Sequence, residues 1–229
     1  MPQKNSYTNL SESGKIQEKF NSEDLKLLHN ELAVISDNGK RNKYTVNFGL
    51  MNSKAYHDKF ENLSASKQVN EGLYKQAAKI LSHRSGTEYE DIAMLDARTG
   101  KVLVENTSAF GAYKFQCGLT RQQEKFLENS GKKVEILHNH PNSSVPSTAD
   151  IVGLFRREYA TASTVVCHDG TIYRMEKITQ FDDIESLVKI SYNQIKAFDY
   201  PDFLIESYAS ELVVETLEKK RILKFKKVL

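Results

Sequence analysis

Two histidines and an aspartate within thirteen positions are the residues of this chain whose types and spacing best fit catalytic chemistry. His138 and His140 flank Asn139 and precede Pro141, and nine residues separate His140 from Asp150. Two imidazoles and one carboxylate form a ligand set that a catalytic zinc ion commonly takes, with its fourth position left to water. The sequence therefore predicts a site for a divalent metal ion, which we expect to be Zn²⁺.

The elements around this motif explain how its side chains could converge. Alternating residues from Lys133 to His138 predict a short strand, and side chains two positions apart share one face of a strand. Residues 141–146 are rich in proline, serine and asparagine and predict a loop. Apolar residues at helical spacing predict a helix from Thr148 onward, so Asp150 falls in its first turn and can face the histidines.

A purely structural interpretation of the same residues also exists. Ser147 and Asp150 have the spacing of a capping box, and an acidic residue in the first turn stabilises a helix without any metal. A single histidine on a strand is more often a hydrogen-bonded structural residue than a ligand. The joint occurrence of all these residues between a predicted strand and a predicted helix favours the metal site.

The segment from Ile136 to Pro141, followed by Ser147-x-x-Asp150, resembles the JAMM motif of the JAB/MPN metalloproteases. Its His-Asn-His-Pro run is most similar to the bacterial RadC-type branch. The resemblance implies that His138, His140 and Asp150 bind zinc and that Ser147 helps to stabilise the tetrahedral intermediate. One departure is the spacing between His140 and Asp150, which is one residue shorter than the family usually has.

A zinc hydrolase of this kind also needs a proton carrier, because the attacking water loses a proton and the leaving amine gains one. The family places a glutamate upstream, near the end of an early strand or hairpin. Residues 91–96 and 101–105 predict such a hairpin, and Glu105 ends its second strand. Glu105 precedes His138 by 33 positions (138 − 105 = 33), which is similar to the RadC-type spacing. We therefore predict Glu105 as the catalytic base. The fallback candidates are Glu88 and Glu90.

The order of predicted elements resembles the JAB/MPN fold over residues 66–180. It implies an α/β (α+β) fold with a cytidine-deaminase-like central mixed β-sheet flanked by helices. We expect residues 1–65 to be an N-terminal extension that is helical in part and partly disordered. We expect residues 66–180 to form the metal-dependent catalytic domain, and residues 181–229 to form a helical C-terminal extension with a basic tail.

Finer predictions concern the segments before the hairpin. Residues 1–21 are polar and predict disorder, and Ser22 can cap a helix that extends to about residue 35. Residues 44–48 alternate weakly and predict a strand, whereas residues 52–68 look irregular. A stripe of apolar residues from Val69 to Leu81 predicts a helix that packs on the catalytic sheet.

Composition limits the class of protein. The chain has 229 residues and is 39% hydrophobic, enough to bury one core with extensions or two small domains. Its two cysteines, Cys117 and Cys167, form no close pair, which argues against a disulfide framework and against a thiolate zinc site. No apolar run approaches the roughly 20 residues that span a bilayer. We expect a cytoplasmic protein without a membrane partner.

The C-terminal end of the chain is basic. From Leu217 to Leu229 there are six basic residues and one acidic residue, Glu218. Such a run could contact nucleic-acid phosphates. A net charge of only +2 favours instead a solvated edge strand whose lysines discourage aggregation. The six are Lys219, Lys220, Arg221, Lys224, Lys226 and Lys227.

The sequence therefore predicts a zinc metallopeptidase or isopeptidase that hydrolyses an amide bond in a protein or peptide. By resemblance, the substrate is a ubiquitin-like or other flexible protein tail. The alternative is a RadC-like or phage-type binding or assembly protein that keeps the JAB fold without peptidase activity and could contact DNA. These predictions leave the substrate's identity and the oligomeric state open.

Overall fold

The computed structural model describes residues 9–10, 16–17, 43–108, 113–198 and 200–229. The helix predicted after Ser22 lies outside the described residues, as does most of the segment 1–21. Within that segment, β1 (Asn9–Leu10) and β2 (Ile16–Gln17) pair in the antiparallel sense.

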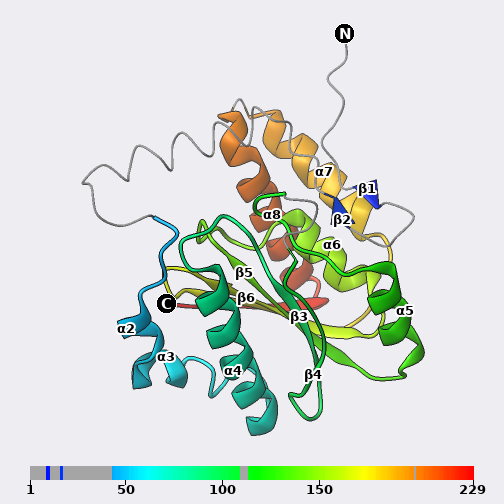
Figure 1. The fold of residues 1–229 in the computed structure, drawn as a ribbon. Helices are drawn as coiled ribbons and strands as arrows, with labels where there is room; N and C mark the ends of the chain where they lie inside the picture. The colour runs from blue at the N-terminus through cyan, green and yellow to red at the C-terminus, as the bar shows by residue number, and fades with distance from the viewer. Residues whose placement is uncertain (1–8, 11–15, 18–42, 109–112, 199) are drawn as a thin grey trace.

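A six-stranded mixed sheet with the strand order β4-β3-β5-β6-β7-β8 forms the centre of the molecule (Figure 1). β5 and β6 are parallel because a helix connects them, and all other neighbours are antiparallel. The predicted α/β fold with a central mixed sheet flanked by helices is confirmed. The strands are β3 (Ile92–Asp96), β4 (Val102–Asn106), β5 (Val134–His140), β6 (Ala160–Cys167), β7 (Ile172–Lys177) and β8 (Leu223–Val228).

Helices cover both faces of this sheet (Figure 1). On one face lies α4, whose predicted apolar stripe is buried against strand residues such as Leu95 and Leu137. On the other face, apolar residues of α6, α7 and α8 pack together over Met94 and Ile136. The helices are α4 (Lys67–Arg84), α5 (Arg121–Asn129), α6 (Thr148–Arg156), α7 (Ile184–Lys196) and α8 (Asp202–Lys219).

The alternation of β5 fixes which side of the sheet each motif residue faces. Ile136 belongs to the core under α6 to α8, whereas Leu137 belongs to the core under α4. Side chains alternate along a strand, so His138 and His140 share the face of Ile136. Asn139 lies on the opposite, α4 face.

The N-terminal part of the described chain differs from its prediction. No strand forms over residues 44–48; instead, α2 (Phe48–Met51) begins there, and α3 (Lys54–Asp58) follows in the segment predicted to be irregular. The side chain of Asn47 accepts a hydrogen bond from the amide of Leu50, and Ser53 does the same at the start of α3. These local caps stabilise single helical turns that a short alternating pattern does not reveal.

The C-terminal segment adds two helices to one face of the sheet and one strand to its edge. The predicted helical extension is present as α7 and α8. The end of the basic tail forms β8, an edge strand of the sheet whose lysines at 224, 226 and 227 are exposed. Among the helices of the described residues, none has both the length and the apolar character needed to cross a membrane.

Candidate metal centre

The three predicted metal ligands meet where β5 ends and α6 begins. His138 Nε2 lies 3.0 Å from Asp150 Oδ1, and His140 Nε2 lies 3.3 Å from Asp150 Oδ2. The two Nε2 atoms are 3.1 Å apart. Both histidines are buried, and the Asp150 side chain is 17% exposed. This His-His-Asp group could bind a metal ion.

The spacing of these atoms fits a small tetrahedral ion. Zinc bonds of about 2.1 Å at tetrahedral angles separate neighbouring ligand atoms by about 3.4 Å. The three separations at the cluster, 3.0, 3.1 and 3.3 Å, are slightly shorter, and the two that involve Asp150 end on different oxygens of its carboxylate. The donor set is therefore close enough together to hold one metal ion.

His140 is oriented for coordination through its outer nitrogen. Its Nδ1 lies 3.1 Å from the carbonyl oxygen of Ser144, which can only accept, so Nδ1 carries a proton and Nε2 is the ring nitrogen that could bind an ion. Burial lowers the pKa of His140, but the carboxylates of Glu90 and Asp150 outweigh it and raise the pKa to about 9. Burial acts to raise the pKa of Asp150, but the two imidazoles hold it well below its usual range. The carboxylates therefore favour positive charge at the imidazoles, and a metal ion that binds His140 Nε2 would take the place of the proton there.

Ser147 lies beside the cluster as the cap of α6. Its amide and hydroxyl donate to Asp150 Oδ2 at 2.7 and 2.8 Å, and its Oγ accepts from the Asp150 amide at 3.2 Å. Asp150 thus belongs both to the capping box of α6 and to the group of candidate metal ligands. Because a carboxylate can only accept, the Ser147 hydroxyl proton is committed to Asp150 and does not point to a substrate oxygen in this arrangement.

The structure does not bring Glu105 to the cluster. Glu105 and Leu137 both pair with Ala93, so Glu105 faces α4, on the side of the sheet opposite His138. There its carboxylate binds Lys79 at 2.6 Å, and this hydrogen bond lowers its pKa. The prediction that Glu105 lies beside the metal ligands is therefore corrected, because the register between β3 and its neighbouring strands sets Glu105 on the opposite face of the sheet.

Glu90 is the upstream glutamate that does reach the cluster. Ile92 pairs with His138, and extending this register by two residues sets Glu90 opposite His140, on the face of both imidazoles. Glu90 is 6% exposed and interacts electrostatically with both histidines and Asp150. Burial raises its pKa, as suits a group that both takes and gives a proton. The other fallback candidate, Glu88, forms an ion pair with Lys114 instead.

Two residues of α8 support the ligand loop, and sequence analysis missed both. Glu206 Oε1 accepts hydrogen bonds from the amide and the hydroxyl of Thr148 at 2.9 and 2.7 Å. Ser210 Oγ donates to the carbonyl of Pro146 at 2.5 Å. Their partners lie 58 and 64 positions away, so no local pattern could have indicated these contacts.

The other histidines of the described residues have side-chain or main-chain partners. His57 contacts Glu71, and His83 contacts Asp91. His168 contacts the carbonyl oxygen of Tyr44. His57 also lies close to two acidic side chains, but that group is partly exposed.

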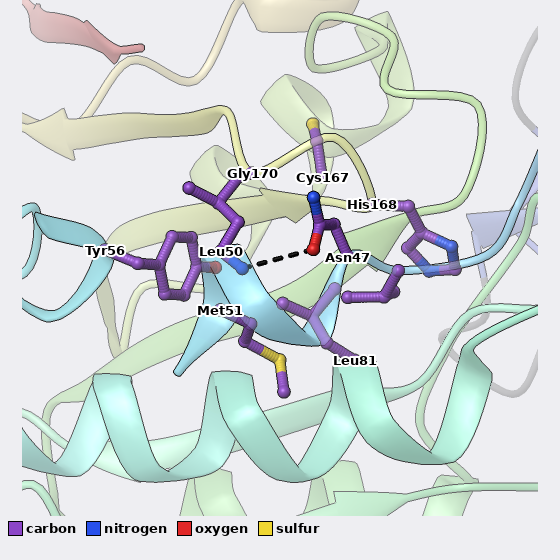
Figure 2. A pocket seen from close by; sticks show the side chains of 9 residues that line it. Asn47, Leu50, Met51, Tyr56, Leu81, Cys167, His168 and Gly170 are labelled. Atoms are coloured by element: carbon purple, nitrogen blue, oxygen red, sulfur yellow. Dashed lines mark hydrogen bonds between the residues drawn. The ribbon is translucent and has the colours of Figure 1, made fainter. Parts of the chain in front are cut away.

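A small pocket lies between α2, α4 and the β6–β7 turn (Figure 2). His168 and Leu81 are among the side chains that line it, together with Tyr56. None of the three candidate ligands lines this pocket, so it is separate from the metal centre.

Comparisons with protein-family models, with curated proteins and with solved structures find no match to this chain.

Proposed function

We propose that this chain is a zinc-dependent hydrolase of the JAB/MPN type that cleaves an amide bond in a protein or peptide. The observation that carries this proposal is the convergence of His138, His140 and Asp150, with ligand atoms 3.0 to 3.3 Å apart, in the residue order of the JAMM motif. A fourth group, the buried carboxyl of Glu90, lies on the same face and supplies the acid–base function that hydrolysis requires.

The roles follow from the chemistry of the side chains. His138, His140 and Asp150 would hold the ion, which, when bound, polarises water and lowers its pKa to about 7. Glu90 accepts a proton from the attacking water as the water oxygen bonds to the carbonyl carbon. Glu90 then gives that proton to the amide nitrogen as the C–N bond breaks, which leaves a carboxylic acid and an amine.

The burial of the cluster supports an extended substrate. The side chains of His138, His140 and Asp150 are 2, 6 and 17% exposed. A folded protein surface could not bring a peptide bond to such a recessed group, whereas a flexible tail could. In line with the family resemblance, we propose the tail of a ubiquitin-like or other protein as the substrate.

The test combines metal analysis with a matched pair of glutamate variants. Zinc per chain is measured for wild type, His138→Ala and Asp150→Asn. Cleavage of ubiquitin-like fusions and of a peptide library is then followed by mass spectrometry, with and without a zinc chelator. Glu90→Gln and Glu105→Gln make the same chemical change on opposite faces of the sheet.

We expect one zinc ion per wild-type chain, its loss in both ligand variants, and cleavage that the chelator abolishes. Glu90→Gln should retain zinc and lose activity by a factor of about 10² to 10⁴, the usual worth of acid–base catalysis. Glu105→Gln should stay near wild type. Zinc binding without any cleavage, or equal activity in the two glutamate variants, would contradict the proposal.

A further inference from the structure

The middle residue of the His-Asn-His run has no role in the chemistry proposed above, yet it is the most buried of the three. Asn139 is 0% exposed and faces α4, away from the two imidazoles. A buried side-chain amide is costly unless its donors and acceptor are satisfied. Its partners therefore indicate what this asparagine is for.

The amide of Asn139 bonds to the main chain on both sides of one residue, and that residue is Glu90. Asn139 Oδ1 accepts from the amide of Asp91 at 2.8 Å. Asn139 Nδ2 donates to the carbonyl of Tyr89 at 3.2 Å. The side chain thus takes the place of a peptide group in a strand pairing and fixes the backbone immediately before and after Glu90.

His168 orients this amide from behind. Asn139 Nδ2 lies 3.1 Å from His168 Nε2, and His168 Nδ1 lies 2.6 Å from the carbonyl oxygen of Tyr44. Because that carbonyl can only accept, the imidazole proton is on Nδ1, and Nε2 is left to accept from the asparagine. Every donor and acceptor of the Asn139 amide then has one consistent partner, so the amide cannot turn over without losing hydrogen bonds.

The same short segment is also held from α4. Arg84 Nε donates to the carboxylate of Asp91 at 2.6 Å, and the Asp91 side chain is 1% exposed. Asp91 is therefore held through its amide by β5 and through its carboxylate by α4. With both anchors on the α4 side, the intervening side chain of Glu90 faces the metal cluster.

We propose that Asn139 is a positioning residue that holds Glu90 in reach of the metal centre. The catalytic part of this inference rests on the proposed function, whereas the placement of the 89–91 segment does not. Proton transfer requires the carboxyl within hydrogen-bond reach of the water and of the leaving nitrogen. A displacement of about 1 Å costs about a hundredfold in rate.

The test uses Asn139→Asp, which keeps the side-chain shape but replaces both N–H donors with an acceptor. Asn139→Ala, which leaves space for water, is the second variant. The matched control is Asn70→Asp: Asn70 is also buried, accepts from the Ser64 amide at 2.8 Å and donates to the carbonyl of Glu61 at 2.6 Å. Zinc content, the hydrogen exchange of the Asp91 amide, and kcat and KM are measured for each.

Both Asn139 variants should retain one zinc ion per chain. In Asn139→Ala the Asp91 amide loses its acceptor and should exchange at least about tenfold faster. In Asn139→Asp the acceptor remains, but a carboxylate oxygen replaces the donor to the carbonyl of Tyr89 and repels it, so the exchange of the Asp91 amide should also rise. With a substrate that wild type cleaves, kcat should fall about a hundredfold at little-changed KM. Adding Glu90→Gln to Asn139→Asp should cost little more, since the two changes disable one function. Asn70→Asp should lower stability without affecting kcat or the exchange of Asp91.

Unchanged Asp91 exchange in both Asn139 variants would overturn the inference, as would a loss of kcat that Asn70→Asp reproduces. If wild type cleaves none of the substrates, the proposed hydrolase function fails by itself. The exchange of the Asp91 amide then still decides whether Asn139 holds the segment around Glu90.

Discussion

At the scale of single residues, Asp150 serves a helix and a candidate metal centre with one carboxylate. Its Oδ2 accepts from the amide and hydroxyl of Ser147, and the same carboxylate faces His138 and His140. Negative charge in a first turn is stabilised by the helix dipole, so α6 favours the ionised form that a cation needs. The cap therefore also sets the orientation of the ligand.

Ser147→Ala should separate these two effects. Loss of the cap should lower the free energy of unfolding by about 1 kcal/mol. Loss of a hydrogen bond to a ligand should weaken zinc binding by about tenfold. Denaturation by urea and competition with a zinc-binding dye measure the two quantities.

The control for Ser147→Ala is Thr120→Ala, which removes the same kind of capping box from α5. It should cost similar stability and leave the zinc affinity at its wild-type value. Equal zinc affinities in the two variants would show that the cap does not orient Asp150.

The residue scale also shows why the candidate ligands could be predicted from the sequence and the glutamate beside them could not. His138, His140 and Asp150 follow from local rules, namely the two-residue period of a strand and the first turn of a helix. Glu105 lies near the end of β4 and Glu90 lies two residues before β3, and only the register between β3, β4 and β5 decides which of them faces the histidines. Register is a tertiary property, and a shift of one residue reverses every side chain.

At the scale of elements, two glycines allow α4 to lie directly against the β3–β4 turn. A Cβ atom on Gly72 would stand 2.2 Å from the carbonyl oxygen of Gly100. A Cβ atom on Gly100, whose φ is +68°, would stand 2.3 Å from the carbonyl oxygen of Gln68. This backbone contact seats α4 on the sheet, and α4 in turn carries Arg84, which anchors Asp91.

Gly72→Ala should therefore destabilise the protein. Helix propensity alone would predict the opposite, because glycine in a helix interior is normally less favourable than alanine by about 1 kcal/mol. The forced shift of α4 should cost about 1 to 3 kcal/mol. Urea denaturation measures whether the free energy of unfolding falls or rises. Gly118→Ala is the control, because a Cβ atom there meets no atom within 4 Å. A Gly72→Ala variant as stable as wild type would contradict the close contact.

The long elements were predictable, and the short ones were not. The apolar stripe of α4 repeats over several turns, and the start of α6 combines a capping box with apolar residues at helical spacing, so both stand out against chance. Tyr44 to Phe48 shows an alternation of only five residues, which side-chain caps at Asn47 and Ser53 outweigh. Short segments are decided by such individual hydrogen bonds and by burial of single residues such as Tyr56.

At the scale of the whole molecule, the C-terminal segment shares the core and the sheet of the part that holds the candidate metal centre. Val188, Val213 and Leu223 are buried in one cluster with Ile151 and Phe155. β8 extends the sheet by pairing with β7 along its full length. Helix α8 additionally supports the ligand loop through Glu206 and Ser210. Residues after 180 therefore complete the structure that positions Asp150.

A chain that ends at residue 180 should consequently not form a stable metal centre. Loss of residues 181–229 exposes the apolar side of α6. Each buried aliphatic side chain that becomes exposed costs about 1.5 to 3 kcal/mol, and the sum over several such side chains exceeds the stability of an ordinary domain. Calorimetry should show no cooperative unfolding, and zinc binding should be lost. Because a truncated chain can fail for trivial reasons, Val213→Asp in the full chain tests the same contact, with Glu215→Ala on the exposed side of α8 as its control. Cooperative unfolding with full zinc binding in the shortened chain would mean that residues 66–180 form an independent unit, and α8 would then have no part in holding Asp150.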